Sequence, residues 1–218
     1  MLIDTGTRCA DLDKIVGQIT GKPLEVIVTH MHPDHAGCIK YFDKVWMHRA
    51  DTVLVPQHAA DYQGEFLYME EGQVFDLGGR KLEVAWMPGH TPGSVVLLDK
   101  ANGDCYSGDA FGSGEVWLQC VPMSPIATFH ESCCRMEKLM KEGHIKDIWC
   151  GHYPYLKSSL PLAYIQTMIR ISHRLMNGDQ EGSEPYSNYF IKMPPTARKL
   201  AEGRAMIVYD STNIPEAR

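Results

Sequence analysis

The chain lacks the features that mark several classes of protein. No apolar run approaches the roughly 18 residues that a membrane-spanning helix needs, and the N-terminus lacks the charged-then-apolar layout of a secretory signal peptide. Lysine and arginine total 21 against 27 aspartates and glutamates, which gives a formal net charge of -6 at pH 7. No basic excess therefore indicates a nucleic-acid partner. We expect a cytoplasmic protein that binds neither a membrane nor nucleic acid.

Regularly spaced cysteine pairs are also missing. The chain has seven cysteines, an odd number, and no Cys-x-x-Cys pair occurs among them. They are Cys9, Cys38, Cys105, Cys120, Cys133, Cys134 and Cys150. This irregular pattern argues against a disulfide framework and favours a reducing compartment.

The 218 residues are enough for one large soluble domain with a buried core. Hydrophobic periodicity predicts strands near 1–4, 24–29, 44–48, 81–86, 94–98, 105–107 and 145–150. It predicts helices near 8–20, 49–55, 126–142 and 159–177. The connection 57–73 is predicted as a loop over a site, and residues 189–209 fit a strand or a helix equally. Strands and helices mix without strict alternation, which favours a layered α/β fold with some antiparallel sheet.

Five histidines and two aspartates form a set of potential metal ligands. Each lies at or just after the end of a predicted strand, or begins the helix that follows, and sites in layered α/β folds converge there. The set comprises His30, His32, Asp34, His35, His90, Asp109 and His152. Imidazole and carboxylate groups are ligands that divalent zinc, manganese and iron accept.

The densest part of this set is the stretch from His30 to His35. In an extended or turning segment, residues i and i+2 project to the same side, so His30 and His32 can bind one metal ion. Asp34 and His35 follow where the chain turns into a helix, and they can face a second ion close by. The alternative is a polar loop with incidental histidines, but it must also explain the histidines that follow glycines downstream.

The motifs resemble those of the metallo-β-lactamase superfamily, and within it those of the glyoxalase II-like hydrolases. Five motifs carry the resemblance, namely Leu2-Ile3-Asp4-Thr5-Gly6, His30-x-His32-x-Asp34-His35, Gly89-His90-Thr91-Pro92-Gly93-Ser94, Ser107-Gly108-Asp109 and Gly151-His152. It implies a four-layer αβ/βα sandwich with the metals in a shallow cleft at one edge of the two sheets. We expect a single domain over 1–218, with the core motifs in 1–155 and a C-terminal helix and tail in 156–218.

The resemblance also implies how the ligands are shared between two metal ions. The first ion would be held by His30, His32 and His90, the second by Asp34, His35 and His152, and Asp109 would bridge both. The implied cofactor is two divalent metal ions, expected to be zinc, with manganese or iron as alternatives. Because true β-lactamases of this fold usually carry cysteine or serine at the position of Asp109, the aspartate favours thioester, lactone, phosphodiester and RNA-processing members.

The start of the chain departs from the family pattern. Family members usually have strand-forming residues before the Leu-Ile-Asp-Thr-Gly motif, whereas Met1 sits directly on it. We expect the first sheet to lack its opening strands, or another element to replace them. A partner subunit that covers this exposed edge would make the protein a homodimer.

The hypothesis for function is a metal-dependent hydrolase of a small ester, thioester, lactone or related small-molecule substrate. Two metal ions ~3.5–4 Å apart can share a water and lower its pKa toward ~7, and the resulting hydroxide attacks the substrate. Asp34 is the candidate to orient the hydroxide and shuttle a proton. Tyr153 and Tyr155 are candidates for substrate contact. Asp4 has two open roles, to orient a metal ligand or to cap the helix that follows.

Other functions on the same fold stay open. A sulfur dioxygenase uses a single iron held by the three histidines of the first metal site, and metal content would distinguish it from a hydrolase with two ions. A phosphodiesterase or β-lactamase-type activity is a further alternative, although nucleic-acid phosphodiesterases usually need an appended domain or basic arm. A metal-binding protein without catalysis is disfavoured, because a structural zinc site needs only one metal and four ligands.

Overall fold

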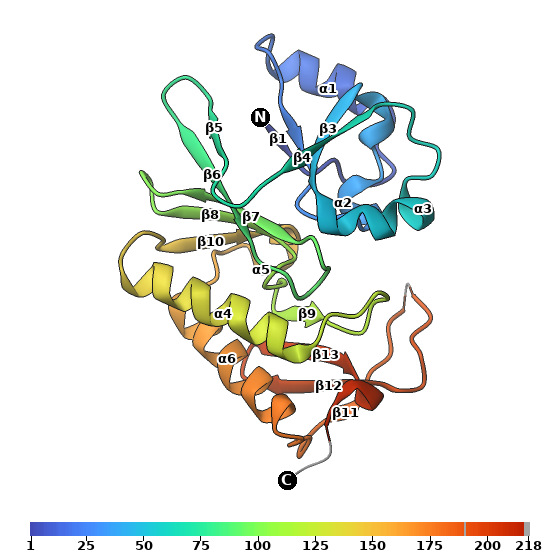
Figure 1. Cartoon of the computed structure of the whole chain (residues 1–218), viewed down its shortest axis with the longest axis vertical. Coiled ribbons are helices and arrows are strands. Elements are labelled where there is room, and N and C mark those ends of the chain that lie inside the picture. Colours follow the sequence, from blue (N-terminus) through green and yellow to red (C-terminus); the bar gives the residue numbers. More distant parts are fainter. Residues whose placement is uncertain (190, 216–218) are drawn as a thin grey trace.

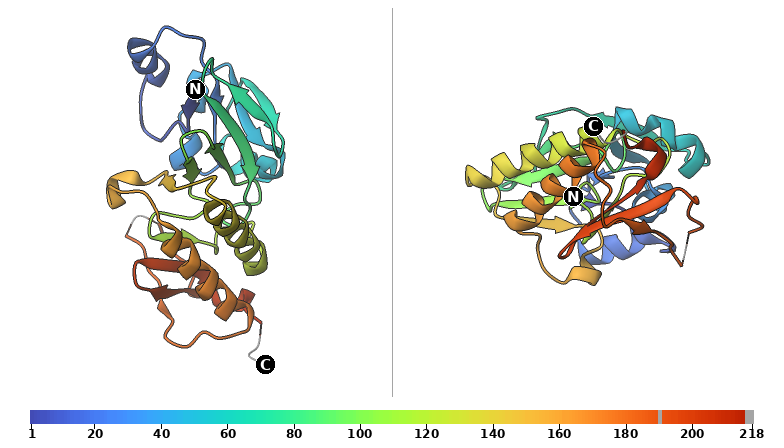
Figure 2. Two further views of the ribbon diagram at one scale, coloured as in Figure 1. Left: turned by 90° about the vertical axis from the view of Figure 1, so that its left-hand side faces the viewer. Right: turned by 90° about the horizontal axis from the view of Figure 1, so that it is seen from below.

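The computed structural model describes residues 1–189 and 191–215 (Figure 1). Two sheets lie face to face, short helices cover the outer face of the first, and two long helices cover the outer face of the second. A third, four-stranded sheet lies beyond those helices, so that the N-terminal and C-terminal sheets are at opposite ends of the long axis (Figure 2). The predicted layered α/β sandwich is therefore confirmed. In the described residues, no helix combines the length and the apolar character needed to cross a bilayer.

The first sheet is parallel throughout and has the order β1-β2-β3-β4. Its strands are β1 (Leu2–Ile3), β2 (Val26–Ile27), β3 (Lys44–His48) and β4 (Glu65–Met69). The helical segments between them are α1 (Leu12–Ile19), α2 (Pro33–Ala36), the 3-10 turns Ile39–Tyr41 and Arg49–Leu54, and α3 (Val55–His58). β1 lies at one edge of this sheet.

The prediction of a loop over 57–73 was wrong for its second half. Residues 65–69 form β4, which pairs in parallel with β3 along its whole length. Met69 points into the space between the sheets, whereas Phe66 and Tyr68 pack on the outer face. Polar residues around this short segment masked its period-2 pattern, and only the parallel partner β3 makes it a strand.

The second sheet is mostly antiparallel, with the order β10-β8-β7-β6-β5. Its strands are β5 (Val74–Asp76), β6 (Lys81–Trp86), β7 (Val95–Asp99), β8 (Asp104–Gly108) and β10 (Asp147–Cys150). β10 pairs in parallel with β8, so both strands deliver the chain to the same edge of the sheet. All five residues of β7 are buried, because this central strand is covered on both faces.

The C-terminal part contains the predicted long helices and a sheet that the sequence pattern did not indicate. The helices are α4 (Ile126–Lys141), the short α5 (Tyr153–Leu156) and α6 (Leu162–Met176). The third sheet has the order β11-β12-β13-β9, formed by β11 (Glu184–Pro185), β12 (Ala197–Glu202), β13 (Ala205–Asp210) and β9 (Glu115–Trp117). The unassigned region 189–209 thus contains most of an antiparallel hairpin, which packs on α6.

Three hydrophobic clusters hold these layers together. One lies between the two main sheets and includes Ile27, Met69, Val84 and Leu97. A second joins the first sheet to its short helices, and a third joins the second sheet to α4, α6 and the C-terminal sheet. All seven cysteines are free thiols, in agreement with the prediction that no disulfide framework exists.

The cluster between the sheets gives the first testable prediction. Ile27 is fully buried there, so Ile27→Ala should lower the free energy of unfolding by about 2–5 kcal/mol. Ile19→Ala is the matched control, because Ile19 is 79% exposed at the end of α1 and its loss should matter by less than about 0.5 kcal/mol. Denaturant unfolding of the metal-free chain measures both. Equal effects of the two variants would contradict the assigned core.

Candidate metal centre

The fold brings all seven candidate ligands together at one edge of the sandwich. Four of them follow β2 of the first sheet: His30, His32 at the N-cap of α2, and Asp34 and His35 on α2. The other three come from the second sheet: His90 lies between β6 and β7, and Asp109 and His152 lie just after β8 and β10. The side chains form two groups, and within each group the potential ligand atoms all lie within 4.8 Å of one another.

The first group contains His30, His32 and His90. His32 Nδ1 and His90 Nε2 are 2.9 Å apart. His90 Nδ1 donates a hydrogen bond to the backbone oxygen of Trp117 at 2.8 Å, which leaves Nε2 as the atom with the free lone pair. His30 Nε2 is buried and has no hydrogen-bond partner. With His32 in the tautomer that leaves Nδ1 unprotonated, three imidazole nitrogens with free lone pairs can face one ion.

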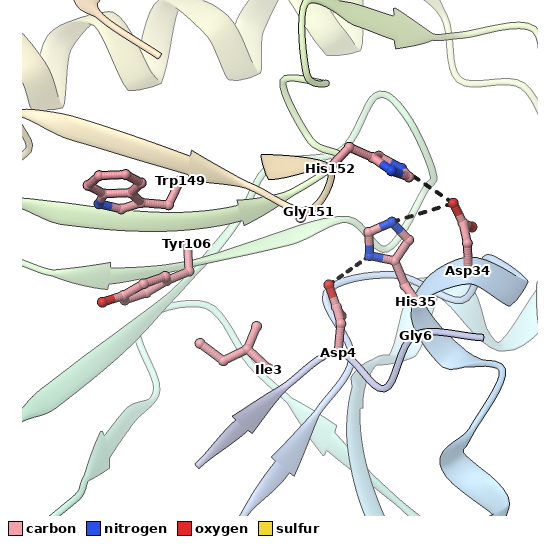
Figure 3. Close-up of a pocket in the computed structure, with 10 residues that line it drawn as sticks. Ile3, Asp4, Gly6, Asp34, His35, Tyr106, Trp149, Gly151 and His152 are labelled. Carbon is pink, nitrogen blue, oxygen red and sulfur yellow. Dashed lines mark hydrogen bonds and ion pairs between the residues drawn. The ribbon is translucent and has the colours of Figure 1, made fainter. Parts of the chain in front are cut away.

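The second group contains Asp34, His35, Asp109 and His152 (Figure 3). His152 Nε2 lies 3.0 Å from Asp109 Oδ2 and 3.3 Å from Asp34 Oδ2. His35 Nε2 lies 3.4 Å from Asp109 Oδ1 and 3.8 Å from Asp34 Oδ2. The rings of His30 and His35 are 4.2 Å apart between centroids, so the two groups adjoin.

Asp4 orients His35 from behind. Its Oδ2 accepts a hydrogen bond from His35 Nδ1 at 2.7 Å, and both of its oxygens accept from Thr29, one from the backbone nitrogen and one from the hydroxyl. The residue at the N-cap of α1 is Asp11. Of the two roles that stayed open for Asp4, the structure therefore shows the orienting one, which fixes His35 with Nε2 toward the cluster.

Glycines allow the strand ends to approach this closely. A Cβ on Gly151 would lie 2.4 Å from His35 Cε1 and 3.0 Å from Asp109 Oδ1. A Cβ on Gly108 would lie 2.1 Å from Thr29 Oγ1, and this residue also has a positive φ of 49°. A side chain at either position would displace a ligand or the residue that supports it.

The pattern of unpaired atoms tests whether a metal ion fits these residues. Among the described residues, four buried side-chain nitrogen or oxygen atoms have no hydrogen-bond partner. Three of the four belong to this cluster, namely His30 Nε2, His35 Nε2 and Asp109 Oδ1. Buried polar atoms without a partner are costly and rare. Imidazole nitrogens and carboxylate oxygens are donors for divalent ions, so the residues fit divalent metal ions.

The two groups differ in their electrostatics. Burial is the main cause that lowers the pKa of each histidine in the first group, to about 3 for His32. Hydrogen bonds to Asp109 and Asp34 raise the pKa of His152 to about 9. Burial opposes a charge on His35, but Asp4 and Asp109 still raise its pKa well above 6.5. At neutral pH and without metal, the first group is therefore uncharged, whereas the second holds protons between its histidines and carboxylates.

A cavity of about 350 Å³ adjoins the second group. Asp34, His35 and His152 line one end, and the side chains of Tyr106 and Trp149 line the other (Figure 3). The cavity therefore places an aromatic surface beside the candidate ligands.

Tyr153 and Tyr155 both lie on α5, directly after His152, and both are exposed. The Tyr153 ring lies 5.8 Å from the Trp149 ring, and the Tyr155 ring lies 5.9 Å from that of His152. Their position agrees with a place at the rim of the site. Substrate contact by either tyrosine stays a prediction.

Two further residues interact with the cluster, although the sequence pattern did not indicate them. The His58 ring on α3 lies 5.8 Å from the His32 ring. Burial, together with the charges of Asp34 and Asp109, raises the pKa of the Cys120 thiol to about 11. Neither residue sits in a recognisable motif, because each comes from a loop or short helix that only the tertiary fold brings to the site.

Residues 1–130 match the family model of the Metallo-beta-lactamase superfamily. The chain belongs to this superfamily. One relative is the human acyl-coenzyme A thioesterase MBLAC2, which is 28% identical over 159 residues that cover 61% of this chain and 57% of the relative. Another is the hydroxyacylglutathione hydrolase of Aeromonas salmonicida, 29% identical over 166 residues that cover 75% of this chain and 60% of the relative. The chain thus spans less than two thirds of either relative.

Solved structures of the superfamily share the fold. The crystal structure of TTHA1623 in a di-iron-bound form matches with a TM-score of 0.57 and 26% identity, over 74% of this chain and 83% of that one. A beta-lactamase domain protein from Burkholderia ambifaria matches with a TM-score of 0.62 and 20% identity, over 80% of this chain and 66% of that one. The second likeness concerns the fold alone.

The electrostatics predict how the stability of the metal-free protein depends on pH. The first-group histidines have lowered pKa values, so their contribution is present above pH 6.5 and is lost as the pH falls. His152 has a raised pKa, so its contribution is present below pH 6.5 and is lost as the pH rises through about 9. The melting temperature measured in chelator should therefore peak near pH 6.5.

His152→Asn tests the alkaline side of this profile. The variant should lose less stability than the wild type between pH 6.5 and pH 9, because the titrating group is gone. Parallel melting profiles for the two proteins across this range would show that the interaction of His152 with Asp109 and Asp34 does not stabilise the fold.

Proposed function

We propose that the chain is a metal-dependent hydrolase of acyl thioesters with a dinuclear metal centre. The observation that carries the proposal is the pair of adjoining ligand groups, in which three buried nitrogen and oxygen atoms make no well-formed hydrogen bond. A purely structural site would need only one ion and four ligands. Seven donors at the edge of two sheets, with exposed side chains beside them, suit two ions and a reaction.

The ligands would divide between the two ions by their groups. His30, His32 and His90 would hold one ion, and Asp34, His35 and His152 the other. Asp109 is proposed to serve both, since its carboxylate contacts His35 and His152 in the second group and interacts electrostatically with His30 in the first. Two bound divalent ions would supply an activated water and would polarise the carbonyl oxygen of the substrate. Zinc is the proposed metal, with manganese or iron as alternatives.

Asp34 is the proposed proton acceptor. Its side chain is 47% exposed, against 13% for Asp109, so it can meet a water that enters from solvent. Burial opposes its charge, but the hydrogen bond from His152 lowers its pKa below the usual value and keeps the carboxylate ionised at neutral pH. Asp34 would orient the attacking water through a hydrogen bond, accept its proton and deliver that proton to the leaving thiol.

The relatives support the choice of an acyl thioester as substrate class. An acyl-coenzyme A thioesterase and several hydroxyacylglutathione hydrolases are among them, and both names describe removal of an acyl group from a thiol carrier. The structure with two irons is 26% identical to the chain and supports two ions. The cytoplasmic location and the homodimer stay predictions.

Metal content gives the first test. Elemental analysis of the chain purified without added metal should find about two divalent ions per molecule. The double variant His32→Ala, Asp34→Ala should lose both, since each group loses a ligand. His144→Ala should keep both, because His144 is half-exposed and its acidic partner among the described residues is Glu142, which belongs to neither ligand group. One iron per chain would favour a dioxygenase, and no metal in the wild type would refute the proposed centre.

A substrate panel gives the second test. We expect kcat/KM for acyl-coenzyme A and acylglutathione thioesters to exceed that for a lactone, a phosphodiester and a β-lactam by at least about 100-fold. Asp34→Asn at saturating metal should lower kcat for the thioester by roughly 10²–10⁴-fold, which is the usual contribution of a positioned acid or base. A chain that prefers the phosphodiester or the β-lactam would contradict the proposed substrate class.

A further inference from the structure

Asp51 is a buried carboxylate that is not among the candidate ligands. It lies on the 3-10 turn Arg49–Leu54 after β3, and it is only 1% exposed. Its Oδ2 accepts hydrogen bonds from the backbone nitrogen of Met31 and the hydroxyl of Thr91, each at 2.9 Å, and its Oδ1 accepts from the backbone nitrogen of Gly93 at 2.6 Å. A carboxylate is costly to bury, so these three bonds balance a considerable desolvation penalty.

The three donors belong to the two loops that carry the first ligand group. Met31 stands between His30 and His32, and Thr91 directly follows His90. The first loop comes from the first sheet and the second from the second sheet. Asp51 therefore joins the backbones of both loops, although the residues that it contacts are 20 to 42 positions away in the sequence.

The second loop is built closely around this carboxylate. A Cβ on Gly93 would lie 2.6 Å from Asp51 Cγ, so any side chain there would displace Asp51 or the loop. Ser94 Oγ also bonds the backbone nitrogen and the hydroxyl of Thr91, at 3.0 and 2.8 Å. The hydroxyl of Thr91 is therefore held in position to donate to Asp51.

We propose that Asp51 is a positioning residue for the first metal site. By holding the Met31 amide and the Thr91–Gly93 backbone at fixed places, it sets where the rings of His32 and His90 meet, with their ligand nitrogens 2.9 Å apart. The inference rests on the proposed function in one respect, namely that a metal ion binds to the first ligand group. Groups that support metal ligands from outside typically change metal affinity 10–100-fold when they are lost.

Asp51→Asn tests the proposal with little change in size. An amide offers one acceptor oxygen in place of two, so the Met31 or the Gly93 N–H must face an NH₂ group. Zinc titration of the metal-free protein against a chromophoric chelator should show one site weakened by roughly 10–100-fold and the other unchanged. Hydrogen exchange of the metal-free variant should be faster in the peptides that contain Met31 and Gly93.

Asp99→Asn is the matched control. Asp99 is also fully buried, and it accepts hydrogen bonds from Arg80 and Asn102 at the far end of β7 from the ligands. Its loss should lower the melting temperature and leave both zinc affinities unchanged. If Asp51→Asn fails to fold, Thr91→Val removes only one of the three hydrogen bonds and should weaken the same site by a smaller factor.

The outcomes separate this proposal from the proposed function. The positioning role would be overturned if Asp51→Asn bound zinc at both sites with the affinities of the wild type. It would also be overturned if the substitution weakened both sites equally. A wild-type chain that binds no zinc would refute the metal centre. In that case, hydrogen exchange at Met31 and Gly93 still tests the role of Asp51. If Asp51→Asn left this exchange unchanged, the conclusion that Asp51 holds the two loops together would be overturned as well.

Discussion

Burial of unpaired ligand atoms at the edge of the sandwich is the constraint on which the rest of this structure depends. Imidazole nitrogens and a carboxylate oxygen are removed from water there without well-formed hydrogen bonds, which opposes folding in the absence of an ion. Neighbouring residues partly compensate by accepting hydrogen bonds from the second ring nitrogen, Nδ1, of two of the histidines. Asp4 accepts from His35 Nδ1, and the Trp117 backbone oxygen accepts from His90 Nδ1. These contacts determine which nitrogen faces the site, so the ligand set is prepared before a metal ion arrives.

Burial and charge separate the two ligand groups chemically. The first group is buried among other histidines and stays neutral, so a cation can bind its lone pairs without displacing a proton. In the second group, Asp34 and Asp109 share protons with His35 and His152, and a metal ion would replace those protons as the positive partner. Asp34 and Asp109 would thus have a positively charged partner both in the metal-free and in the metal-bound protein. This explains how two carboxylates are tolerated beside a buried site.

The sequence predicted which side chains gather at one edge better than it predicted the sheets around them. The ligands follow strand ends with short-range spacing, and period-2 projection pairs His30 with His32 regardless of the rest of the fold. By contrast, β4 exists because β3 offers a parallel partner, and the hairpin β12–β13 exists because α6 offers a surface to cover. Asp51 is invisible in the sequence for the same reason, since its partners lie on two distant loops. Local patterns encode ligands, whereas long-range contacts decide edge strands and supporting groups.

The origin of the ligands couples metal binding to the stability of the whole sandwich. His30 to His35 come from the first sheet, whereas His90, Asp109 and His152 come from the second. The backbone already links the sheets here, because the Thr29 oxygen accepts from the Val95 nitrogen at 3.0 Å, and Thr29 also holds Asp4. Ions that bind both sides would cross-link the two sheets at the same edge. Since an unfolded chain cannot preserve this arrangement, most of the binding free energy would also stabilise the folded state. The cost of burying unpaired ligand atoms is thereby recovered when the ions bind, and the same cluster serves the fold and the proposed reaction.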